Sequence, residues 1–491
     1  MFTNRSPRLE ILSEDAVAVL KRGWTRLMHE FGVRFDHAEA LGYFRAAGQD
    51  VQGDIVHFDP EFVGQMVALA PAEFDLVSRN PERNVIIGGN HMVFCSMQGP
   101  PFVREGSARR PATLADHVNF CKLAQMAPQL DVGGGIICEP QDINHATGHL
   151  DLQYNSITLS DKPYKGSPIS RMAARDTVAM AAIVAGGRTE LEKASRFFAS
   201  VNPVSPMTWD DRMSGAIIEF AAAGQALALS PFLMMGAVSP AALPGAVAQD
   251  IAEALAGLCL AQLVRPRTPV MLGGFLTSID MWNGQPTFGG PESARSLLMF
   301  GQLARYLEIP LRAGGGFLTS SPVPDAQAGY ESMNTMMNAF LAGANFTLHC
   351  AGWLESALTI SYEKFAVDLQ MLEALIAEFT PIEISDDLLV FDDHVSAGHT
   401  GTFLATPWTA EHFRDCFYRP FLSTSENIQT WEANGSQDIA ARAGAVWRQM
   451  LADYEEPPMD VAVRRELAEF VSRRKEEIEA MLDEDGELVE P

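Results

Sequence analysis

The chain has 491 residues, of which 47% are hydrophobic, so it can bury a large core and is too long for one small domain. Its net charge of −26 argues against nucleic acid or an anionic membrane surface as a partner, but permits a cationic substrate or a basic protein face. The six cysteines form no CxxC pair and Met1–Glu10 carries no apolar signal segment, which predicts a reduced, cytoplasmic protein. Because Gly215–Ala248, the longest apolar region, is interrupted by prolines and polar residues, no membrane span is expected.

The first ninety residues predict a small layer of helices and short strands. Ser13 is the expected N-cap of a helix that ends near Phe31, with Glu14 and Asp15 in its first turn. Further elements are expected as helices over 37–47 and 60–69, a strand and turn over 53–60, and a hairpin over 74–87. The pattern leaves open whether this layer closes the bottom of the next domain or extends its top.

One unit recurs eight times between residues 92 and 350: a short apolar run, a Gly/Pro-rich loop and a helical stretch. The runs begin near Met92, Asp131, Pro163, Arg196, Pro231, Pro269, Pro310 and Asn345. The helices are expected over 114–126, 143–159, 172–185, 210–229, 247–263, 292–307, 326–341 and 362–379. Strands without a polar face, alternating with helices, are typical of a parallel sheet covered by helices. We therefore predict an α/β fold, a (β/α)8 TIM barrel.

The predicted organisation has three parts. An N-terminal α+β layer covers 1–90, the barrel covers 91–380, and a C-terminal extension covers 381–491. The extension should begin with a loop rich in His, Asp and Thr, followed by helices over 439–454 and 461–483. The acidic end, 483–491, has the composition of a disordered segment.

Barrel chemistry is carried by the loops at the carboxyl ends of the strands, which gives each candidate residue a position. The candidates there are Phe94, Gln98, Glu139, Phe275, Trp282, Arg312, Phe317, His349, Trp353 and Glu355. Recurring aromatic residues suit a quaternary ammonium, which has no N–H to donate, although core packing is an alternative. Glycines near the ends of three strands indicate a ligand close to the backbone, or else tight turns.

Arg312 stands in the middle of an apolar strand and must find an anion, either a substrate carboxylate or an acid such as Glu355. Cys95, Cys138 and Cys350 could form a zinc site with His349 or Glu139. His349 and Cys350 are adjacent and would face opposite ways on a regular strand, so we interpret the cysteines as buried apolar residues and expect no metal. Because neither GxxxxGK[ST] nor a strand-linked GxGxxG occurs, ATP or nicotinamide chemistry has little support.

Motifs along nearly the whole chain resemble the trimethylamine methyltransferase family. They lie at 30–35, 80–83, 314–316, 323–331, 342–345, 351–355, 361–364, 417–420 and 473–475. The resemblance implies a (β/α)8 barrel that demethylates a methylated amine and passes the methyl group to the Co(I) corrinoid of a separate carrier protein. Because the chain contains only standard residues, it resembles the branch without pyrrolysine, whose members act on quaternary amines such as glycine betaine. A quaternary nitrogen is already a leaving group, so mainly positioning is required.

On this interpretation, Phe94, Phe275, Phe317 and Trp353 surround the methylammonium, while Arg312 and His349 bind a substrate carboxylate. Gln98 and Glu139 complete the polar wall, and Trp282 and Glu355 contact the substrate as well. No tightly bound cofactor is expected, since the corrinoid comes with the partner. The amphipathic tail suggests a homo-oligomer.

Three alternatives stay open at this point. The first is a methyltransferase of the same fold that uses a folate or thiol acceptor. The second is a betaine-binding or regulatory protein without catalysis. The third is an acidic scaffold whose C-terminal helix only assembles subunits.

Overall fold

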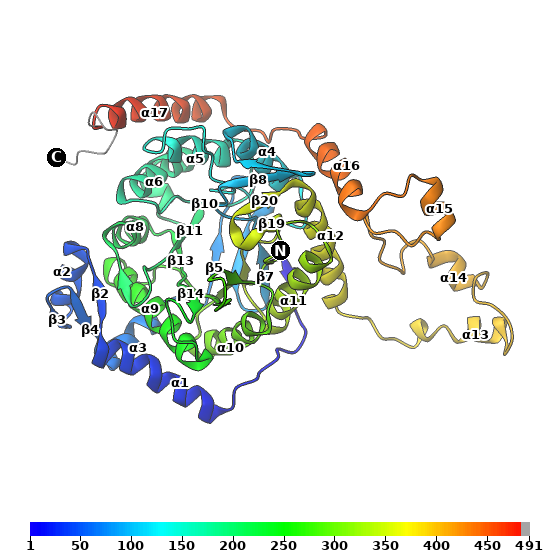
Figure 1. The fold of residues 1–491 in the computed structure, drawn as a ribbon, viewed down its shortest axis with the longest axis horizontal. Helices are drawn as coiled ribbons and strands as arrows, with labels where there is room; N and C mark the ends of the chain where they lie inside the picture. The colour runs from blue at the N-terminus through cyan, green and yellow to red at the C-terminus, as the bar shows by residue number, and fades with distance from the viewer. Residues whose placement is uncertain (483–491) are drawn as a thin grey trace.

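The computed structural model describes residues 1–482, in which helices surround a curled, mainly parallel sheet (Figure 1). Along the sheet the order is β7 (His91–Phe94), β18 (Phe346–Thr347), β17 (Leu311–Ala313), β15 (Val270–Ile279), β13 (Ala226–Leu229), β11 (Phe197–Val201) and β10 (Tyr164–Lys165). These neighbours all pair in parallel. β1 (Phe2–Thr3) adds an antiparallel pair to β7.

The first and last of these parallel strands, β7 and β10, both contact segment 131–134. Val132 forms a parallel bridge to Cys95, directly after β7. On its other side, Gly133 N donates to Pro163 O at 3.0 Å and Lys165 N donates to Gly134 O at 3.1 Å. The predicted second apolar run therefore lies between β7 and β10, although it forms no regular strand.

One predicted strand was misplaced. The fifth run was expected from Pro231, after a helix over 210–229, but α8 (Asp211–Ala222) ends earlier and the strand is β13. Gly224, with φ +68°, breaks the chain between them, and the alanine-rich run after it leaves the helix. The residues after Pro231 form β14 (Phe232–Met235), which pairs with the outer half of β15.

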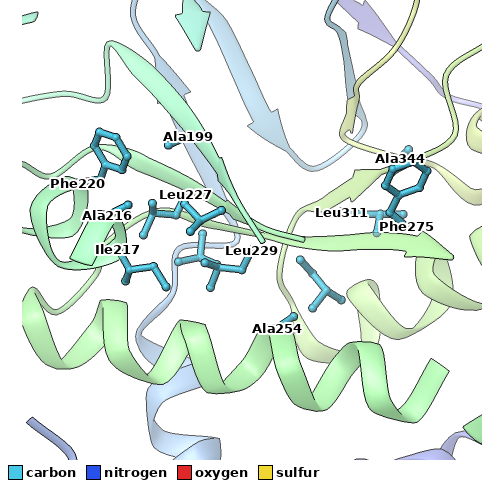
Figure 2. Close-up of a cluster of buried hydrophobic side chains, with 14 of the residues drawn as sticks. Ala199, Ala216, Ile217, Phe220, Leu227, Leu229, Ala254, Phe275, Leu311 and Ala344 are labelled. Atoms are coloured by element: carbon cyan, nitrogen blue, oxygen red, sulfur yellow. The ribbon is translucent and has the colours of Figure 1, made fainter. Parts of the chain in front are cut away.

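Helices follow the strands nearly as predicted. They are α4 (Leu114–Met126), α5 (Gly148–Thr158), α6 (Arg171–Ala185), α9 (Leu243–Val264), α10 (Pro291–Leu307), α11 (Ala326–Ala342) and α12 (Tyr362–Phe379). Figure 2 shows Leu227 and Leu229 of β13 on the side of the sheet toward Ile217 of α8 and Ala254 of α9. α9 is apolar and long enough to cross a membrane. However, 89% of its most apolar 18-residue stretch is buried within the protein, as in a core helix.

Strand side chains alternate between two cores. Those facing the helices, such as Met92 and Leu272, belong to the large core shared with the helices. The opposite faces form a smaller core inside the curled sheet, with Val93, Phe198, Met271, Phe346 and Leu348. In the part of each strand that contributes to both cores, the core to which a side chain belongs therefore shows which way it points. Phe275, further along β15, packs with the large core, and its direction follows from the alternation after Met271 instead.

The N-terminal layer has the predicted elements. They are α1 (Glu14–Arg26) continued by a π-turn (Leu27–Phe31), β2 (Val33–Phe35), α2 (Ala38–Ala46), β3 (Asp50–Gln52), β4 (Ile55–His57), α3 (Pro60–Leu69), β5 (Glu73–Leu76) and β6 (Val85–Gly88). The three α-helices of the layer pack on α9, outside the sheet (Figure 1). The β5–β6 hairpin inserts Leu76, Val85 and Ile87 into the smaller core. Val77 N donates to Ser195 O at 2.7 Å, just before β11, so the hairpin closes the amino end of the strands.

The C-terminal extension returns to the body in two helices. α16 (Ile439–Ala452) packs on α12, and α17 (Val461–Glu479) packs on α5 and α6, where Lys475 binds Asp151 at 2.6 Å. Between α12 and α16 an arm of short helices reaches away from the body (Figure 1). These helices are α13 (Phe391–Ala397), α14 (Pro407–His412) and α15 (Ile428–Ala433), where a loop was predicted at the start. The predicted disordered end, 483–491, lies outside the described residues.

Two helix glycines test the packing around α9, on which the N-terminal helices lie. A methyl group on Gly257 of α9 would lie 2.6 Å from the Trp209 ring, whose Nε1 donates to Glu253 O at 3.0 Å. Gly257→Ala should therefore lower stability by about 1–3 kcal/mol, despite its better helix propensity. Gly64→Ala in α3, with nothing within 4 Å, should raise stability by about 0.5–1 kcal/mol. Thermal unfolding midpoints that move in the same direction for both variants would contradict this packing.

Candidate active site

Two buried cations point into the curled sheet from different strands. Leu311 and Ala313 face the helices, so Arg312 between them faces the interior. Tyr164 stacks on Phe197 in the outer core at 5.7 Å, so its neighbour Lys165 also faces the interior. Arg312 and Lys165 are each only 2% exposed. Besides burial, the charge of Arg312 lowers the pKa of Lys165, because the two cations lie close to each other. Both also lie close enough to the Cys95 thiol to interact with it electrostatically.

His349 lies beside them, after β18. Its ring centroid lies 5.7 Å from that of Phe275 and 4.7 Å from that of Trp353. The His349 backbone has φ +66°, a left-handed conformation that costs a non-glycine residue about 1–3 kcal/mol. It is held there because its carbonyl accepts from Phe317 N at 3.0 Å and a methyl group on Gly316 would lie 2.2 Å from that oxygen.

Four aromatic rings form a wall next to the cations. The Arg312 Cζ lies 5.3 Å from the centre of the Phe275 ring, and Phe232 contacts Phe275 at 4.7 Å. Phe288 meets the Trp353 ring edge to face at 5.1 Å. The indole of Trp353 is fixed by a hydrogen bond from Nε1 to Thr319 O at 2.9 Å. This aromatic wall comes from β14, β15, the turn after β16 (Pro286–Thr287) and β19 (Trp353–Leu354).

The nitrogen atoms of the cluster lack acceptors among the described residues. Lys165 Nζ, Arg312 Nε and Nη1, and His349 Nδ1 are buried and form no hydrogen bond. A buried donor without a partner costs about 1–3 kcal/mol, and more when charged. Asp250 of α9 attracts Arg312 but forms no ion pair with it within 4.0 Å, and burial raises the pKa of Asp250 well above its usual value, which favours the neutral carboxyl group. The cluster is therefore suited to an anion.

Burial shifts the pKa values of the ionisable groups in the cluster, so that these groups differ in protonation state at neutral pH. It lowers the pKa of Arg312 to about 10, so the guanidinium stays charged at neutral pH. Burial, aided by Arg312, lowers the pKa of Lys165 to about 7. Burial and both cations lower the pKa of His349 well below its usual value, so its imidazole is neutral. Burial raises the pKa of Cys95 to about 12, so its thiol does not neutralise the cations.

The structure brings together Phe275, Arg312, His349 and Trp353 of the predicted residues. Lys165, Phe232 and Phe288 complete this cluster and were not predicted. A lysine in an apolar strand is the same signal as Arg312 and could have indicated Lys165. Phe288 had no such signal, because only the return of the chain through β16 brings it to Trp353.

Other predicted residues lie elsewhere. Phe94 faces the helices and stacks on Phe340 at 5.7 Å, since its strand neighbours Val93 and Cys95 point inward. Phe317 is fully buried, with Lys364 Nζ 5.8 Å from its ring. Glu355 pairs with Arg109 at 2.7 Å, so it does not neutralise Arg312.

The remaining three predicted residues are more accessible. Trp282 is 99% exposed, and Glu139 is exposed as well. Gln98 is partly buried in the loop after β7 and forms no side-chain hydrogen bond within the described part of the chain. Cys95, Cys138 and Cys350 are buried free thiols.

Comparisons with known proteins agree over nearly the full length. A family model described as trimethylamine methyltransferase matches residues 1–479. A glycine betaine methyltransferase of Desulfitobacterium hafniense is 39% identical over 96% of this chain and 98% of its own. A proline betaine:corrinoid methyltransferase of Eubacterium limosum is 30% identical over 82% of this chain and 85% of its own. A trimethylamine methyltransferase of Desulfitobacterium hafniense is 27% identical, covering 95% and 94%. The chain therefore belongs to the trimethylamine methyltransferase family.

Proposed function

We propose that this chain demethylates glycine betaine or a closely related betaine and passes the methyl group to the Co(I) corrinoid of a carrier protein. One observation carries the proposal: a buried cationic cluster without acceptors directly adjoins an aromatic wall, with Arg312 Cζ 5.3 Å from the Phe275 ring centre. A zwitterion would satisfy both parts of this site, since its carboxylate would bind the cationic cluster and its quaternary ammonium would bind the aromatic wall. The names of the relatives, glycine betaine methyltransferase and proline betaine:corrinoid methyltransferase, support the same substrate class.

The carboxylate of the betaine would accept from Arg312, Lys165 and His349. Its quaternary ammonium would lie against Phe275, Phe288 and Trp353, where each cation–π contact contributes about 0.5–2 kcal/mol. The contact between Arg312 and Phe275 places the two subsites next to each other, which favours a substrate whose two charges lie close together. The other predicted residues are not among those that we assign to this contact: Phe94, Gln98, Glu139, Trp282, Phe317 and Glu355.

The chemistry asks little of the protein beyond positioning. The carrier's corrinoid supplies a strong nucleophile for the methyl carbon. The C–N electron pair stays on nitrogen, so the leaving group is a neutral tertiary amine and no proton transfer is needed. This chain holds the substrate carboxylate, fixes the direction of one N-methyl group and excludes water through its aromatic wall.

We also propose that the curled sheet is a complete (β/α)8 barrel, in which segment 131–134 takes the place of the second strand. Its contacts with β7 and β10 support this closure. The proposed domains are 1–90, 91–380 and 381–491. Self-association stays a prediction, supported by the exposed apolar side chains of the arm, such as Phe391 and Phe417.

The proposed activity is tested by anaerobic methylation of free Co(I) cobalamin, followed by ultraviolet–visible spectroscopy. Glycine betaine should serve as methyl donor, whereas choline, which lacks the carboxylate, and trimethylamine, which lacks the fixed charge, should not. If the methyl group is transferred only to a folate or a thiol, the acceptor is not a corrinoid. If the protein binds betaine but transfers a methyl group to no acceptor, it is a betaine-binding protein and not a methyltransferase.

Removing the central cation tests the carboxylate subsite. Arg312→Met should weaken glycine betaine binding about tenfold to a hundredfold in isothermal titration, since a charge-assisted hydrogen bond is lost. Choline binding should change little. Arg295→Met, on the exposed side of α10, is the matched control and should leave both affinities unchanged. Equal loss for choline and betaine would remove Arg312 from this role.

The second cation predicts a pH dependence. Burial lowers the pKa of Lys165 to about 7 in the free enzyme, and a bound carboxylate favours its protonated form. Betaine affinity should therefore fall as pH rises above about 7, by at most about tenfold per pH unit. Titrations of Lys165→Met should give weaker binding without this slope. A slope that persists in Lys165→Met would assign the titration to another group.

A further inference from the structure

A strand pair extends outward from the candidate site. β15 runs past the sheet to Ile279 and returns through β16, with Ser278 opposite Thr287 and Ile279 opposite Pro286. The base of this hairpin carries Phe275 and Phe288 of the aromatic wall. The hairpin is therefore continuous with the site at its base and leads away from it at its tip.

The tip of the hairpin is held by its own hydrogen bonds. Asp280 Oδ1 accepts from Trp282 N at 2.8 Å, and its other carboxylate oxygen accepts from Asn283 Nδ2 at 3.0 Å. Gly284 N donates to Asp280 O at 2.7 Å. This ordered turn presents Met281 and Trp282 to solvent, 74% and 99% exposed. A turn that exposes a whole indole leaves a large apolar surface uncovered.

More exposed apolar side chains lie in the loops after other strands. We define the apolar rim as Ile169, Val204, Met281, Trp282, Val323 and Leu358, all of which are exposed. They lie in the segments after β10, β11, β15, β17 and β18, and the carboxyl ends of these parallel strands lie at one edge of the sheet. The apolar rim therefore lies on the face from which the proposed substrate site is reached.

We propose that the apolar rim, with Trp282 as its main contact, is the docking surface for the protein that carries the corrinoid acceptor. This inference rests on the proposed function. Methyl transfer needs the nucleophile at bonding distance from a methyl group held by residues that are themselves buried. The carrier must then bring its cofactor to this face, and an exposed tryptophan is a residue type that dominates interface energies. The exposed side chains of the apolar rim favour a carrier whose matching surface is apolar at its centre, and the net charge of −26 favours basic residues around that centre.

Two acceptors separate docking from chemistry. Wild-type and Trp282→Ala enzyme are compared with free Co(I) cobalamin and with a corrinoid carrier protein reconstituted with Co(I) cobalamin. Free cobalamin needs no protein contact, so its methylation rate should stay within about twofold in Trp282→Ala. With the carrier, KM should rise about tenfold to thirtyfold, as for a tryptophan at the centre of an interface. Phe31→Ala, at a 66% exposed aromatic residue of the N-terminal layer, should change neither reaction.

Each other result overturns the inference. Loss of activity with free cobalamin in Trp282→Ala would show that the hairpin supports the site rather than a partner. An unchanged KM for the carrier, or a wild-type enzyme that methylates the carrier no faster than free cobalamin, would exclude docking at the apolar rim. A change of oligomeric state in sedimentation would assign the surface to a second copy of the chain. If wild-type enzyme methylates neither acceptor, the proposed function itself fails.

Discussion

The unpartnered charge of Arg312 and Lys165 inside the curled sheet constrains the rest of the site. Removing an ion from water costs several kcal/mol even after the protein relaxes, and no carboxylate of the described residues forms an ion pair with either cation. Burial raises the pKa of Asp250 well above its usual value, which favours its neutral form, and Glu355 is bound to Arg109. The cluster therefore carries positive charge without a partner, which in the proposed function a substrate carboxylate would neutralise. For this reason the aromatic wall alone does not define the proposed ligand.

The surrounding structure fixes this cluster from several directions. Trp353 is held by Thr319, and Gly352 N, just before it, donates to Asp368 Oδ2 at 2.7 Å. Asp368 in turn binds Lys364, whose Nζ also donates to Ser332 at 2.9 Å. These buried groups are paired with each other, unlike the cations of the site. α11 and α12 are thus tied to the loop that positions His349 and Trp353.

The added layers support this arrangement from the opposite side. The β5–β6 hairpin fills the amino end of the sheet with Leu76, Val85 and Ile87, and the three N-terminal helices cover the apolar α9. The carboxyl end remains for the site and the apolar rim. The packing of the N-terminal layer and the proposed site thus lie at opposite ends of the strands, as in barrels built of parallel strands.

The periodicity of apolar residues by itself predicted most of the elements. Each helix or strand buries one of its faces, and this requirement fixes the spacing of apolar residues within the segment itself. Ser13 was predicted as the N-cap of the first helix and is its N-cap in the structure, and α4 and α12 were predicted to the residue. The failure at β13 arose where Ala and Leu suit both helix and strand.

The sequence likewise singled out Arg312, since a charge in an apolar run needs a partner. Only the tertiary structure decided which aromatics join it: Phe94 and Phe275 are alike in sequence, but strand alternation turns one toward α11 and the other into the site. The β15–β16 hairpin turns the chain back, and the contact of Phe288 with Trp353, which is distant in sequence, adds Phe288 to the wall.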